Sequence, residues 1–125
     1  MIYLIDTSAW IEYLDGSAKG EKVNKSLNEA EIFTTSQVIA ELVSKTKRKR
    51  GNVDTAYNAI IKIAKVSEVT PRIAKEAGIL HAETKAKLQS FSLADALIIC
   101  SARALKAKIL TTDSHFKSFK EAIII

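Results

Sequence analysis

The sequence holds little cysteine, proline or glycine, and it has no long apolar run. Cys100 is the only cysteine, which excludes an internal disulfide bond and a cysteine-rich zinc site. One proline and four glycines leave no segment of linker composition, so we predict a single domain over residues 1–125. No apolar stretch approaches the roughly 20 residues of a membrane-spanning helix. No basic segment typical of a signal peptide precedes the first apolar run, and we therefore expect a cytoplasmic protein without membrane association.

Positive charge is in excess along the chain. Its 19 Lys and Arg residues against 14 Asp and Glu residues give a formal net charge of +5. Such an excess attracts phosphate backbones, but it also keeps many small domains in solution. Charge alone therefore does not decide between a nucleic-acid partner and simple solubility.

Short runs of Val, Ile and Leu alternate with longer helical segments. We predict strands at residues 2–5, 31–34, 66–70, 108–111 and 122–125. We predict helices at about residues 8–15, 17–29, 37–49, 53–65, 71–88 and 93–106, with a helical turn after residue 113. The strands lack polar alternation, as strands buried on both faces do. The pattern predicts an α/β fold with three α/β/α layers around a parallel sheet of about five strands.

Four acidic residues stand at corresponding points of this pattern. Asp6 and Asp113 directly follow predicted strands, Asp95 lies in the first turn of a helix, and Glu41 lies about a turn and a half into another. Chain direction therefore places all four at the rim where the strands end, which is the ligand-binding edge of a parallel sheet. Together they would repel one another unless a cation neutralised them. An all-oxygen set without His or Cys suits Mg²⁺ or Mn²⁺.

Each acid also has a purely structural interpretation. Asp6 and Asp113 have the positions of helix N-caps, and Asp95 has the spacing of a capping box with the serine three residues earlier. Glu41 has Lys45 four residues later as an ion-pair partner. The helix that carries Asp95 is apolar on nearly every face, however, and a lone carboxylate there would be costly to desolvate.

The motifs around the acids resemble those of a known family. They read Asp6-Thr7-Ser8, Glu41, Ser92-Leu93-Ala94-Asp95 and Thr111-Thr112-Asp113-Ser114-His115-Phe116. In this order and across essentially the whole chain, they are similar to the motifs of PIN-domain ribonucleases, in particular VapC-type toxins of toxin–antitoxin pairs. The resemblance implies a sheet of strand order 3-2-1-4-5. It also implies a Mg²⁺- or Mn²⁺-dependent endoribonuclease, with the four acids as catalytic and metal-ligating residues, that forms homodimers and binds a small antitoxin protein.

One departure from the family pattern concerns the metal stoichiometry. Many relatives carry a further acid shortly after the fourth, whereas Ser114 and His115 follow Asp113 here. One and two metal ions per site both remain open. Two other functions also remain open, namely a PIN-like module that binds RNA or an antitoxin without cutting, and a nuclease of RNA maturation.

Further residues are candidates for substrate binding. They are Ser8, Thr112, Lys45, Lys47, Arg48, Lys49 and Arg50. The two hydroxyls would hydrogen-bond a carboxylate or the scissile phosphate, or they are ordinary turn residues. The five cations would contact an RNA backbone beside the acidic cleft, or they complement the C-terminal end of their helix and are simply solvated.

Overall fold

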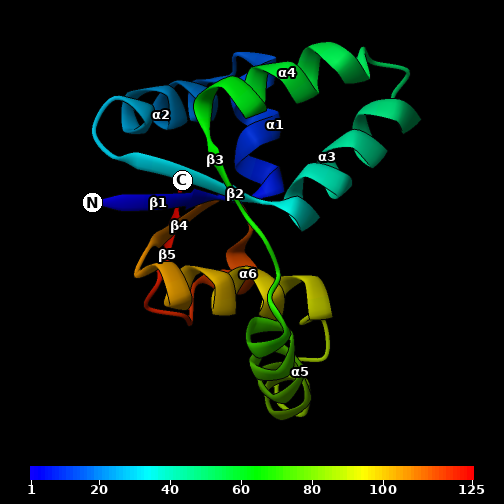
Figure 1. Ribbon diagram of the computed structural model, residues 1–125, viewed down its shortest axis with the longest axis vertical. Coiled ribbons are helices and arrows are strands. Elements are labelled where there is room, and N and C mark those ends of the chain that lie inside the picture. The colour runs from blue at the N-terminus through cyan, green and yellow to red at the C-terminus, as the bar shows by residue number, and fades with distance from the viewer.

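Every strand joins one parallel sheet in the computed structural model, which describes residues 1–125 (Figure 1). The strands are β1 (Ile2–Ile5), β2 (Glu31–Thr35), β3 (Lys65–Ser67), β4 (Lys108–Thr111) and β5 (Ala122–Ile124). Their order is β3-β2-β1-β4-β5, and all four neighbouring pairs are parallel. The predicted fold class and strand order are confirmed.

Helices cover both faces of the sheet. One layer consists of α1 (Thr7–Asp15), α2 (Ala18–Leu27), α3 (Ser36–Arg48) and α4 (Val53–Ile63). The other layer consists of α5 (Pro71–Lys85) and α6 (Leu93–Leu105), drawn below the sheet in Figure 1, and a 3-10 turn, η1 (Ser114–Phe116), precedes β5. Each predicted helix is present, and its ends lie within a few residues of the prediction. No helix is both long enough and apolar enough to cross a membrane.

The third strand is shorter than the sequence predicts. The prediction ran over residues 66–70, but the strand ends at Ser67. β3 pairs with β2, whose last residue, Thr35, lies opposite Ser67. Beyond this point no neighbouring backbone continues the ladder, and Val69 packs against the core instead. The length of the neighbour, and not the composition of the segment, therefore sets the end of β3.

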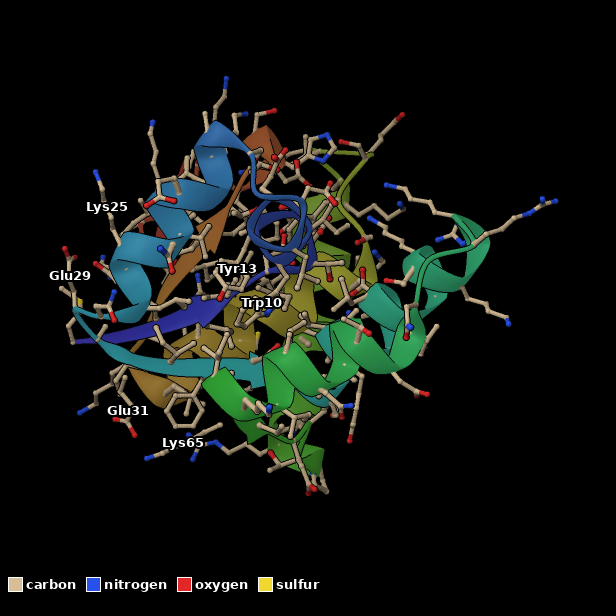
Figure 2. The ribbon with its side chains drawn as sticks, turned by 90° about the horizontal axis from the view of Figure 1, so that it is seen from above. Trp10, Tyr13, Lys25, Glu29, Glu31 and Lys65 are labelled. Carbon is tan, nitrogen blue, oxygen red and sulfur yellow. The ribbon has the colours of Figure 1, made fainter.

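Trp10 anchors α1 against the sheet. Its side chain is fully buried, and its Nε1 donates a hydrogen bond of 3.3 Å to Oγ1 of Thr34 on β2. The ring of Tyr13 stands edge-on to Trp10 with centroids 5.9 Å apart, and Figure 2 shows the two side chains together beside α1. A buried indole with its N–H satisfied fixes both the depth and the rotation of the helix.

A close backbone contact joins α1 to α2. A Cβ atom added at Gly20 would lie 2.1 Å from the main-chain oxygen of Glu12. Only glycine permits this approach, because any side chain would force the two helices apart. Together with the hydrogen bond of Trp10, this contact fixes the position of α1 between the sheet and α2.

Candidate metal centre

The four predicted acids line one small pocket at the C-terminal edge of the sheet. The pocket has a volume of about 90 Å³. Its lining consists of Asp6, Thr7, Ser8, Glu41, Lys45, Ala94, Asp95, Ile98 and Asp113. The acids come from the end of β1, the middle of α3, the first turn of α6 and the turn after β4. The topology thus brings together residues that are separated by more than a hundred positions.

Asp6 is the buried member of the group. It is only 9% exposed, and burial raises its pKa from 3.8 to about 6. Hydrogen bonds from Thr111 and from the backbone of Thr7 oppose this rise, whereas the charges of Glu41 and Asp95 add to it. Although Asp6 occupies the N-cap position of α1, its side chain makes no capping hydrogen bond. At neutral pH the pocket therefore holds a buried negative charge that the protein only partly compensates.

Thr111 connects the first acid to the last. Its fully buried hydroxyl donates to Oδ2 of Asp6 at 2.9 Å and accepts the backbone N–H of Asp113 at 3.0 Å. Thr112 is the hydroxyl residue predicted for this position, but Thr111 is the one that contacts Asp6. The parallel register of β1 and β4, in which Ile5 lies opposite Leu110, is the signal that identifies Thr111 as the neighbour of Asp6.

Ser8 belongs to the same hydrogen-bond network. Its Oγ lies 3.2 Å from Oγ1 of Thr111, donates to Oδ2 of Asp6 at 3.4 Å and accepts the backbone N–H of Thr112 at 3.1 Å. Ser8 lines the pocket, but Thr112 does not. Thr112 thus contributes its main chain to the network and makes no side-chain hydrogen bond there.

The capping interpretations of Asp95 and Asp113 apply, but each uses only one carboxylate oxygen. Asp95 forms a capping box with Ser92, in which its Oδ2 accepts the Ser92 N–H at 2.9 Å. Oδ1 of Asp113 accepts the backbone N–H of His115 at 2.9 Å and lies 3.2 Å from Nδ1 of the same residue. The second oxygen of each carboxylate makes no hydrogen bond within the protein, so capping and ligand binding are compatible.

Glu41 does not form the ion pair that the sequence suggested as its structural role. Its Oε1 accepts a hydrogen bond of 2.8 Å from Gln37, one turn earlier on α3. Lys45 instead lines the pocket as its only cationic side chain. One ammonium group among four carboxylates leaves the pocket with an excess of negative charge.

The donor set fits a hard divalent cation in its chemistry. All four side chains offer oxygen, and the buried charge of Asp6 is one that a cation would stabilise. No three acidic, His or Cys side chains are arranged to hold a metal ion as they stand. Since Asp95, Asp113 and Glu41 each commit one oxygen to a protein donor, a cation would engage the remaining oxygens.

The rest of the predicted substrate-binding cluster lies outside the acidic pocket. Lys47, Arg48, Lys49 and Arg50 are exposed at the C-terminal end of α3, where they also complement the helix dipole. Arg48, Lys49 and Lys45 line a surface groove of about 290 Å³. Because Lys45 borders both the groove and the acidic pocket, the positive surface begins at the pocket itself.

Comparisons with known proteins identify a related family by sequence and related structures by fold. The sequence model of the PIN domain matches residues 3–122. A comparison with proteins of curated function found no matching sequence.

Three solved structures illustrate the similarity of fold. VapBC2 from Rickettsia felis, bound to a DNA fragment from its promoter, has 22% identity and a TM-score of 0.77, with 100% of this chain and 98% of that chain covered. VapC20 from Mycobacterium tuberculosis, described as a sarcin–ricin loop cleaving toxin, has 18% identity and a TM-score of 0.77, with 94% and 95% covered. VapBC-1 from nontypeable Haemophilus influenzae has 23% identity and a TM-score of 0.69, with 97% and 92% covered.

Proposed function

The chain belongs to the PIN domain family, and from this membership we propose that it is a Mg²⁺- or Mn²⁺-dependent endoribonuclease, the toxin of a toxin–antitoxin pair. The observation that carries the proposal is the shared lining of Asp6, Glu41, Asp95 and Asp113 around one pocket. A set of four carboxylates has no structural use that would require them to converge. It has a clear use in a reaction that needs a hard cation beside a phosphate.

The metal would be held by Asp6, Asp95 and Asp113, with Glu41 completing the site. The chemistry that such a cation supplies is Lewis-acid activation of water and polarisation of the phosphodiester. The chain itself fixes the ligands: the hydroxyl of Thr111 orients the Asp6 carboxylate, and the cap of α6 orients Asp95. These hydrogen bonds limit how far Asp6 and Asp95 must move to bind a cation, and they support the proposed site.

Lys45 and the cluster after it would bring the RNA to the acids. A polyanion is repelled by four carboxylates, so a basic rim is required for binding. Lys45 lies in the pocket wall, where its ammonium group would contact the phosphate nearest the reacting bond. Lys47, Arg48, Lys49 and Arg50 would contact phosphates further along the backbone, which positions RNA without reading its sequence.

A protein partner is part of the proposal. Two of the similar structures described above are VapBC complexes, and one further similar structure is called a toxin–antitoxin complex from Klebsiella pneumoniae. We propose a small antitoxin as the partner of this chain and a homodimer as its assembly. Exposed apolar side chains on the layer of α5 and α6, Ile79 at 50% and Leu93 at 51%, support a protein contact on that face.

Cleavage of defined RNAs during titration with Mg²⁺ or Mn²⁺ tests the activity. Wild-type protein should cut only after metal is added, and Asp95→Asn should remain folded but inactive, because the amide keeps the capping geometry and loses the charge. Asp54→Asn is the matched control, since Asp54 is an exposed acid in the first turn of α4. Metal-dependent cutting by Asp95→Asn would refute the site. RNA binding without any cutting by wild type would identify a binding module instead.

A further inference from the structure

A second pocket lies at the opposite edge of the sheet, where α6 ends and β5 begins. It has a volume of about 460 Å³, and its lining consists of Ala102, Arg103, Lys106, Ala107, Lys120 and Glu121. Three of these six side chains are cations, and all three are exposed. The acidic pocket lies at the first turn of α6 and this one at the last, so the same helix connects them over about 12 Å from Asp95 to Arg103.

The only acid of this second pocket is already committed to one of the cations. Oε1 of Glu121 accepts a hydrogen bond of 2.8 Å from Nε of Arg103. Glu121 is 8% exposed, and its Oε2 is buried without a hydrogen-bond partner in the protein. Burial alone would raise the pKa of Glu121, but the hydrogen bond from Arg103 and the charges of Arg103 and Lys120 lower it. The carboxylate is therefore a charged anchor that holds the guanidinium in place.

This anchoring leaves the guanidinium available to a ligand. Nε is the only nitrogen of Arg103 in a hydrogen bond, so both terminal nitrogens remain without a protein partner. Lys106 and Lys120 form no ion pair either. A fixed guanidinium fork beside two ammonium groups matches the oxygens of a phosphate.

The chain between the two pockets extends the positive surface. After Asp113 it runs through η1 back to the start of β5, and exposed Lys117 lies on this segment ahead of Lys120. Nζ of Lys108, at the start of β4, donates to the main-chain oxygen of Lys120 at 3.0 Å, which adds a fourth cation beside the pocket. Lys117 thus adds one exposed cation on the segment that joins the two pockets.

We propose that the pocket of Arg103, Lys106 and Lys120 binds a backbone phosphate of the same RNA chain whose scissile bond lies in the acidic pocket. The inference rests on the proposed function, since it names a second contact of that substrate. The guanidinium of Arg103 would donate hydrogen bonds to two phosphate oxygens, and Glu121 would hold the guanidinium in place. Lys106 and Lys120 would add positive charge. RNA long enough to reach both pockets would bind more tightly than RNA that fills only the first.

Binding of fluorescent RNA to proteins that carry Asp95→Asn, so that no RNA is cut, tests this assignment. An RNA of about 12 nucleotides and one of about 4 nucleotides are compared at several salt concentrations. Lys106→Asn with Lys120→Gln should weaken binding of the long RNA and lower the slope of log K against log salt by up to about 0.7, the value for one lost phosphate contact. Binding of the short RNA should not change. Arg103→Lys should weaken binding of the long RNA without changing the slope of its salt dependence. The positive charge is kept, but the two terminal nitrogens that bind a phosphate together are lost.

Lys22→Gln with Lys25→Gln is the matched control. Both lysines are exposed on α2, in the other helix layer, and Figure 2 shows Lys25 at the outer surface. If the double variant of Lys22 and Lys25 lost as much RNA affinity as the double variant of Lys106 and Lys120, general positive charge would explain the binding and the proposal would be overturned. Arg103→Lys protein that binds the long RNA as tightly as the protein with Arg103 would also overturn it. Polyglutamate serves as a second probe, in place of an acidic protein. If Lys106→Asn with Lys120→Gln abolished binding of polyglutamate but left RNA binding intact, the pocket would bind an acidic protein partner and the proposal would be overturned. If the wild-type protein, which keeps Asp95, did not cleave RNA, the proposed nuclease activity would be refuted, whereas the result on RNA binding at the second pocket would remain valid.

Discussion

Replacement of Asp6 by Asn should stabilise the metal-free protein at neutral pH. The carboxylate is 9% exposed and has the charges of Glu41 and Asp95 nearby. The amide keeps an acceptor for the Thr111 hydroxyl and removes the charge. Loss of a proposed metal ligand would thus increase the free energy of unfolding, the opposite of the usual effect of a core substitution.

The magnitude follows from the pKa of Asp6. A rise from 3.8 to about 6 corresponds to roughly 3 kcal/mol at about 1.4 kcal/mol per pH unit. The folded state binds the proton more tightly than the unfolded state, so the wild-type protein loses stability as pH rises from about 4 to about 6. The full penalty is present above this interval and absent below it. Asp6→Asn should therefore gain up to about 3 kcal/mol at pH 7.5 and nothing at pH 3.5.

Urea unfolding in the presence of a chelator, at both pH values, measures this difference. Asp54→Asn is the control for loss of one exposed charge and should change stability little. Added Mg²⁺ or Mn²⁺ should reverse the order, since a metal at about 1,000 times its dissociation constant stabilises the wild type by about 4.1 kcal/mol, more than the gain of the variant. An Asp6→Asn protein that is no more stable than wild type at pH 7.5, or whose gain persists at pH 3.5, would refute the reasoning.

Two further variants test the surroundings of the pocket. Thr111→Val should destabilise the fold by about 1–3 kcal/mol in urea unfolding, because the Asp113 N–H loses its acceptor and Asp6 its donor. The same change should raise the pKa of Asp6 further and shift the acid limb of the cleavage pH profile to higher pH; an unmoved limb would contradict the assigned hydrogen bond. Replacing Lys47, Arg48, Lys49 and Arg50 together by Gln should flatten the salt dependence of RNA binding, and an unchanged slope would exclude these residues from the RNA surface.

Much of this structure follows from the sequence, because strand and helix periods and cap signals act locally. The capping box of Asp95 is an example, since a serine three residues before an acid is sufficient to predict it. The convergence of the acids also follows from chain direction, since the carboxyl ends of parallel strands share one edge.

The features that the sequence did not predict depend on contacts between distant segments or on the rotation of a side chain. The end of β3 is set by Thr35 of the neighbouring strand. The choice of Thr111 over Thr112 depends on the register of β4 against β1. The partner of Glu41 depends on side-chain rotation on α3, where Gln37 and Lys45 are equally spaced from it in opposite directions. Local patterns carry no information about register or rotation.

The hydrogen bond between Thr111 and Asp6 has a consequence for the order in which the pocket forms during synthesis of the chain. The two residues are 105 positions apart, so the pocket is incomplete until the chain has been synthesised through Thr111. A nascent chain halted before β4 contains Asp6 and Glu41 but lacks the strand that holds Asp6 in place. Translation thus delays assembly of the pocket until β4 has been made and has paired with β1, although Asp6, Glu41 and Asp95 are made earlier.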